Sequence, residues 1–134
     1  MRFYVIAVLF FAIIAQAGEP ADAVLERLAK VEQFAFGPTG YAGVISRGEK
    51  DYRLILSRPS ALADLERLYS VGNMQAKSYA LLGIRRLNPR RFKELSSAIR
   101  DSKDEVITQS GCIVSHESFG VIVGRIEGGK YAGE

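Results

Sequence analysis

Cys112 and His116 are the one pair in this sequence that joins a nucleophile type to a base type. A cysteine beside a histidine can form a thiolate–imidazolium pair, which is the chemistry of cysteine catalysis. On one regular strand the two side chains would share a face, but four strand residues span about 13 Å, so only a bend would bring them into contact. Glu117 would point to the other face and could not orient the imidazole. We therefore expect Cys112 to be a buried small hydrophobe beside a surface His116, with a catalytic or redox-sensitive Cys112 as the alternative.

Metal and cofactor sites are not predicted. One histidine and one cysteine fall short of the four ligands of a structural zinc site. The sequence contains no P-loop, dinucleotide fingerprint or zinc-protease motif, and the glycine-rich residues 37–43 lack the lysine of a phosphate cradle. Tight turns account for those glycines more simply.

The one concentrated positive patch of the sequence is a basic corner on both sides of the Asn88-Pro89 pair, made by Arg85, Arg86, Arg90, Arg91 and Lys93. One interpretation is a solvated junction between two helices, at which Arg85 and Arg86 compensate a helix C-terminus. The other is contact with anionic lipid headgroups, cell-wall polymer or an acidic protein. No aromatic residues that could stack on bases are interleaved with these cations, so nucleic acid is not an expected partner.

Residues 1–17 have the build of a secretory signal peptide. Arg2 supplies a positive start, residues 5–15 form an uncharged apolar run, and Ala15-Gln16-Ala17 offers small residues to a peptidase. The run is shorter than the roughly 20 residues that cross a bilayer. We expect cleavage after Ala17 and a secreted or periplasmic protein.

The remaining chain, residues 18–134, has the size of one domain. Removing 17 of the 134 residues leaves 117, within the usual range of about 100–150 for a domain. With 48% hydrophobic residues and a net charge of only +3 for the full chain, the composition favours a packed core over a general polyanion binder. Cys112 is the only cysteine, so no intramolecular disulfide can form, and a monomer and a Cys112-linked dimer both stay open.

Hydrophobic spacing predicts a series of short helices. An amphipathic helix is expected over residues 20–34, then a structured loop over residues 36–43 with a short strand near residues 41–45. Ser46 and Glu49 are spaced as a capping box that begins a second helix, which ends before Pro59. Further helices are expected over residues 60–72 and 74–87, and Asn88-Pro89 begins a fifth that buries Phe92.

The chain changes character after Asp104. Residues 106–108 and 112–114 are β-formers and predict one or two short strands. Residues 118–127 predict a last helix by the spacing of their apolar side chains, with a strand as the alternative. The fold class is therefore mainly α with a small β element (α+β). The three helices that follow each other from residue 60 must pack antiparallel and are similar to a HEAT-like α-solenoid stretch.

Three segments, residues 36–43, 79–84 and 110–115, carry a resemblance to a group of small exported bacterial proteins of uncharacterised function, one of them encoded near microcin genes. Pro38 stands where the group has glycine. The resemblance implies a small free-standing domain and supplies no activity, cofactor or catalytic residues. We therefore expect a protein–protein interaction or structural module with an unidentified protein partner. The alternatives are an enzyme or redox-sensitive protein using Cys112 with His116, and an envelope-surface binder using the basic corner.

Overall fold

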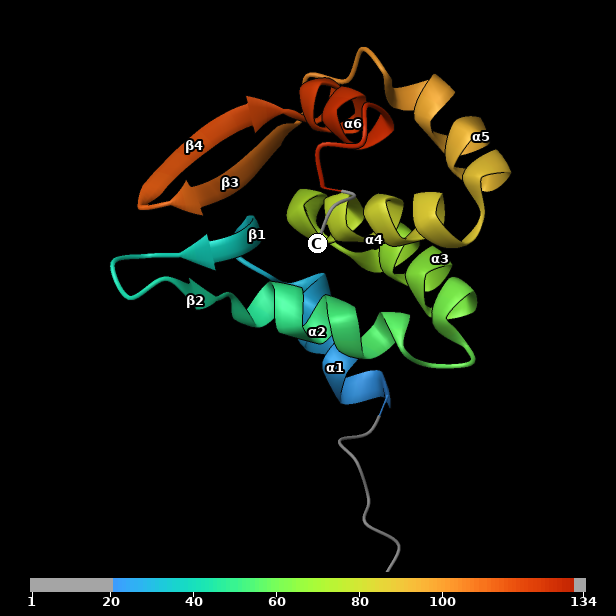
Figure 1. Cartoon of the computed structure of the whole chain (residues 1–134). Helices are drawn as coiled ribbons and strands as arrows, with labels where there is room; N and C mark the ends of the chain where they lie inside the picture. The colour runs from blue at the N-terminus through green and yellow to red at the C-terminus, as the bar shows by residue number, and fades with distance from the viewer. Residues whose placement is uncertain (1–20, 132–134) are drawn as a thin grey trace, which may run out of the picture.

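The computed structural model describes residues 21–131 and contains, in that range, six helices and one four-stranded sheet (Figure 1). The elements in chain order are α1 (Ala21–Ala29), β1 (Phe34–Thr39), β2 (Val44–Ile45), α2 (Arg47–Leu56), α3 (Ala61–Val71), α4 (Met74–Leu87), α5 (Pro89–Ile99), β3 (Glu105–Gly111), β4 (Ile113–Ser118) and α6 (Phe119–Glu127). The predicted signal peptide lies outside the described residues. Within residues 21–131 no helix is long and apolar enough to cross a membrane.

The sheet brings together strands from the N-terminal and C-terminal parts of the described chain. Its strand order is β2-β1-β3-β4, with β1 and β3 parallel and the two outer pairs antiparallel. The helices α2 to α5 are inserted between β2 and β3 in sequence and lie to one side of the sheet in Figure 1. Pairing between β1 and β3 shifts register between Ala35 and Thr39, which makes a bulge in the middle of β1.

Helix α4 is the centre of the hydrophobic core. Tyr79, Leu81 and Ile84 on this helix are fully buried, although they point in different directions around the helix axis. Helices α1, α2, α3, α5 and α6 and strands β1 and β3 all contact α4. A helix that is apolar around most of its circumference has to be surrounded in this way.

The predicted helices from Ser46 to residue 127 are confirmed. Asn73 and Asn88 accept hydrogen bonds from the backbone N–H of Ala76 and Arg91, at 2.9 Å and 3.0 Å, and so cap α4 and α5. The last element, α6, is a helix and not the alternative strand. The α+β class is confirmed as well, with a larger sheet than the one or two strands expected after Asp104 and the short strand near residues 41–45.

The N-terminal prediction needs two corrections. The first helix ends at Ala29 and does not reach Phe34, and the first half of the expected loop over residues 36–43 belongs to strand β1. Both errors have one cause, because β1 is held by contacts distant in sequence. The buried Tyr79 hydroxyl donates a hydrogen bond to the Ala35 carbonyl at 2.6 Å and accepts one from the Ala35 N–H at 3.0 Å, 44 residues away. Gly37, with a φ of 77°, and Pro38 sit in the bulge, where a strand tolerates them.

Candidate functional site

Cys112 is exposed, and the prediction that it is buried is wrong. It lies in the turn between β3 and β4, where Gly111 has a φ of 55°, so the hairpin reverses at the break between the two predicted β-forming segments. His116 lies on β4, and its Nδ1 is 2.8 Å from Glu105 Oε1 across the strand pair. Within the described residues no hydrogen bond joins Cys112 to His116, and no group of His, Cys, Asp and Glu side chains is arranged to hold a metal ion.

The basic corner is divided by the structure into two parts. Arg91 pairs with Glu66 at 2.8 Å and with Glu94 at 3.3 Å, and the largely exposed Arg90 lies 3.7 Å from Glu94. These arginines and the exposed Lys93 belong to α5. Arg85 and Arg86, at the C-terminal end of α4, instead line a cavity on another side of the helix junction.

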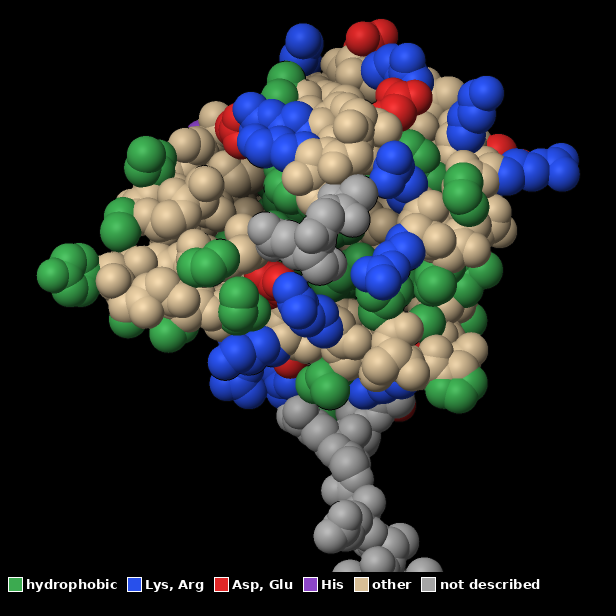
Figure 2. Space-filling model, in the orientation of Figure 1, with side chains coloured by type: hydrophobic (Ala, Val, Ile, Leu, Met, Phe, Trp, Pro, Cys, Tyr) green, Lys and Arg blue, Asp and Glu red, His purple; other side chains and the backbone are tan. Residues whose placement is uncertain are grey.

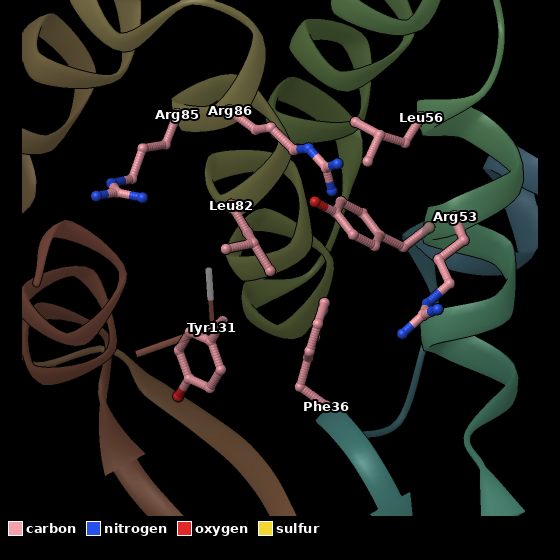
Figure 3. A pocket seen from close by; sticks show the side chains of 8 residues that line it. Phe36, Arg53, Leu56, Leu82, Arg85, Arg86 and Tyr131 are labelled. Carbon is pink, nitrogen blue, oxygen red and sulfur yellow. The ribbon is translucent and has the colours of Figure 1, made fainter. Parts of the chain in front are cut away.

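This cavity, of about 400 Å³, opens between α2, α4, strand β1 and the segment after α6 (Figure 3). Its lining combines apolar and aromatic side chains with three arginines: Phe36, Tyr52, Arg53, Leu56, Leu82, Arg85, Arg86 and Tyr131. Figure 3 shows Arg53 and Arg86 reaching toward the space between α2 and α4, with Phe36 and Tyr131 opposite them. We refer to these eight residues as the arginine–aromatic cavity.

The aromatic wall of the cavity is held by ring contacts. The Phe36 ring packs against Tyr52 and Tyr131, with centroids 5.8 Å apart in both pairs. Tyr131 also contacts the buried Phe34 ring edge-on at 5.3 Å. Edge-on and tilted ring pairs of this kind stabilise one another beyond simple burial, so the wall is preformed.

The cavity carries an excess of positive charge. Among the described residues, no Asp or Glu lines the cavity, and neither Arg85 nor Arg86 has a carboxylate within 4 Å. Arg85 donates one long hydrogen bond, 3.3 Å, to the backbone carbonyl of Glu127. Figure 2 shows Lys and Arg side chains distributed over this face, with Asp or Glu beside only some of them.

Glu49 positions the third arginine. Its carboxylate is fully buried and accepts hydrogen bonds from Arg53 Nη2 at 2.5 Å and from the Gly37 N–H at 2.8 Å. One half of the predicted capping box is confirmed, because the Ser46 hydroxyl accepts from the Glu49 N–H at 3.1 Å. The other half is wrong, since the Glu49 carboxylate turns inward to the bulge of β1 and does not reach back to the Ser46 amide. The carboxylate thus ties α2 to β1 and holds Arg53 at the cavity wall.

The side chains that line the cavity are suited to binding a ligand. Guanidinium groups donate paired hydrogen bonds to carboxylate, phosphate or sulfonate, and aromatic walls accept an apolar body. The proton-transfer groups among the described lining residues are the phenols of Tyr52 and Tyr131. Burial raises the pKa of both, that of Tyr52 to about 12, with Arg86 and Arg53 opposing the shift of Tyr52. A group with such a pKa is poorly matched to general acid–base catalysis near neutral pH.

Of these eight cavity residues, Arg85 and Arg86 were predicted site residues from the sequence, and the other six were not. Arg53 was not singled out because it is one of several charged residues on α2, and Phe36 was not because its segment was expected to be a loop. Tyr131 follows the Gly128-Gly129 pair that ends α6, and nothing local indicates that the chain then turns back to the sheet. One signal was available, namely an aromatic residue flanked by Ala35 and Gly37 in a segment that had to be structured.

Comparison of the chain with protein-family models, with curated proteins and with solved structures found no match.

Proposed function

We propose that this protein is a non-catalytic binding module that captures an organic anion in the arginine–aromatic cavity. The observation that carries the proposal is that Arg85 and Arg86 line the cavity together with a preformed aromatic wall and have no carboxylate partner among the described residues. The anionic group, a carboxylate, phosphate or sulfonate, binds the arginines. Its apolar or aromatic body packs on Phe36 and Tyr131. The size of the cavity, about 400 Å³, lies in the range of sites for small ligands or side chains.

This proposal specifies what the predicted interaction module binds, and it places the binding site in the cavity and not on the helical stack. The predicted HEAT-like stack of α3, α4 and α5 would offer a concave helical surface, whereas the cavity lies where α2 and α4 meet the sheet. Part of the basic corner is retained, because Arg85 and Arg86 belong to both. Export to the periplasm or exterior stays a prediction from the N-terminal sequence, as does the resemblance to small exported proteins.

The test uses the dye 8-anilino-1-naphthalenesulfonate, which joins aromatic rings to one fixed anionic group. We expect its fluorescence to rise on binding, and Arg86→Gln to weaken its affinity about tenfold, because a hydrogen bond to a charged group contributes about 1.5–3 kcal/mol before solvent screening. N-phenyl-1-naphthylamine, which has the same rings without the sulfonate, should bind the wild type and Arg86→Gln equally.

Arg90→Gln is the matched control variant. It removes the same charge from the neighbouring helix, where Arg90 is 92% exposed and lines no cavity. If Arg90→Gln weakens dye binding as much as Arg86→Gln does, the binding is a general effect of net charge and the proposed site is wrong. Equal loss of the uncharged amine would likewise show that Arg86 does not recognise the anion.

A further inference from the structure

A second cavity, of about 200 Å³, lies against the first and shares two of its walls. Phe36 and Tyr131 line both cavities. The second cavity continues along the side of β3 and β4 that faces α6, lined by Phe34, Thr108, Gln109, Ser110, Glu117, Arg125 and Lys130. The two cavities adjoin at these aromatic rings, and we refer to them together as the elongated hollow.

The second cavity has more cations than carboxylates among its described lining residues, namely Arg125 and Lys130 against Glu117. Glu117 and Arg125 neutralise each other through contacts of 2.6 Å and 2.7 Å, and this pairing lowers the pKa of Glu117. Lys130 has no carboxylate within 4 Å among the described residues, and its ammonium lies 5.9 Å from the centroid of the Tyr131 ring. Arginines therefore line the first cavity, Phe36 and Tyr131 are shared by both, and Lys130 lines the second cavity beside Tyr131.

The part of the second cavity that β3 lines is polar. Thr108 is engaged with Glu117 at 3.0 Å, and Gln109 donates its amide to the Gly111 carbonyl at 3.2 Å. The side-chain carbonyl of Gln109 and the hydroxyl of Ser110 are left to bind a ligand. Amide carbonyls and hydroxyls placed beside a bulged strand suit the N–H and C=O groups of a peptide better than an apolar molecule.

We infer that the natural occupant is a short extended segment of an acidic protein, with one carboxylate and its apolar neighbour in the arginine–aromatic cavity and the next acidic residue at Lys130. This inference rests on the proposed function and names the partner class for the same site. Charge complementarity carries it, since acidic groups alternating with apolar groups match two cavities that both contain cations and share the Phe36 and Tyr131 rings. A small anion would fill only the first cavity and leave Lys130 without a role.

The experiment measures displacement of 8-anilino-1-naphthalenesulfonate by capped peptides of one and three Glu-Phe units, with three Gln-Phe units as the uncharged control. We expect the three-unit peptide to bind the wild type more tightly than the one-unit peptide, and the control peptide to bind weakly. Lys130→Gln should weaken the three-unit peptide about threefold to fivefold, the effect of one exposed ion pair of up to about 1 kcal/mol, and leave the one-unit peptide unchanged. Lys103→Gln removes a lysine that lines neither cavity and is the matched control.

The outcomes separate the two proposals. The extended-segment inference is overturned if the three-unit peptide binds the wild type no more tightly than the one-unit peptide does. It is also overturned if the gain in affinity from one unit to three is the same in Lys130→Gln as in the wild type. In both cases the occupant ends in the first cavity. If the dye binds through Arg86 while no peptide displaces it, the partner class is wrong and the proposed function stands. If the dye itself does not depend on Arg86, the proposed function fails and the inference fails with it.

Discussion

Glu49 shows how a single side chain can link the fold to the candidate site. A carboxylate with no exposed surface would be costly unless it is paired, and here Arg53 and the Gly37 amide both donate to it. The same contacts fix the bulge of β1, which carries Phe36, and the arginine opposite that ring. The capping-box spacing predicted the start of α2 correctly, but it could not show where the carboxylate turns, because its partner Gly37 belongs to a strand that the sequence did not indicate.

Two buried tyrosines make the folded protein less stable at alkaline pH. Burial raises the pKa of both Tyr52 and Tyr79 to about 12 in the folded protein, against about 10 in an unfolded chain. As the pH rises, the unfolded chain loses these protons first, so the free energy of unfolding is fully retained below about pH 10 and falls between about pH 10 and 12. The expected loss is on the order of 2 kcal/mol per tyrosine, measured by urea unfolding at a series of pH values.

Tyr79→Phe separates this effect from other alkaline losses. The variant should be less stable at neutral pH, because it lacks both hydrogen bonds to Ala35, but its stability should fall less steeply above pH 10. Phe34→Leu, a change beside the same ring, is the control that lowers stability without removing a titrating group, and it should keep the wild-type slope. An unchanged slope in Tyr79→Phe would show that the ring is not shielded from water in the folded state.

At the scale of elements, short-range sequence patterns predicted the helices well and the sheet poorly. Asn73 and Asn88 cap helices through contacts within three residues, which a sequence pattern can reveal. Strand β1 has Gly37 and Pro38 in its middle and is stabilised by β3 and Tyr79, contacts that lie more than 40 residues away. The cavity was difficult to predict for the same reason, because its walls come from elements distant in sequence: α2, α4, β1 and the segment after α6. Only residues of α4 were predicted.

The packing of α4 against its neighbours can be tested with a pair of glycines. A Cβ at Gly83 would lie 2.5 Å from Leu65 Cδ1 and 3.1 Å from Tyr52 Cε2, whereas a Cβ at Gly124 of α6 would meet no atom within 4 Å. Overpacking costs about 1–3 kcal/mol, and alanine gains about 1 kcal/mol over glycine in a helix. Gly83→Ala should therefore be neutral to destabilising by up to about 2 kcal/mol, and Gly124→Ala stabilising by about 1 kcal/mol, in denaturant unfolding. The reverse order of stability would contradict the close approach of α3 and α4.

At the scale of the whole molecule, the cations fall into two groups with different surroundings. Arg27, Arg67, Arg91 and Arg100 pair with acidic side chains contributed by other elements. Arg85, Arg86 and Lys130 surround the elongated hollow without such partners among the described residues. A net charge of +3 conceals this division, which is why composition alone did not indicate an anion site. Binding at the hollow should weaken with added salt, because its arginines are partly open to solvent.

The most direct test of the anion-site account is a ¹H–¹⁵N chemical-shift titration of the protein with 8-anilino-1-naphthalenesulfonate. Ring currents from the bound dye will shift nearby amides, so we predict the largest changes at Phe36, Arg53, Arg86 and Tyr131. The hairpin turn that carries the exposed Cys112 should change little. Shifts concentrated at that turn or on α5, with the cavity residues unmoved, would contradict the account.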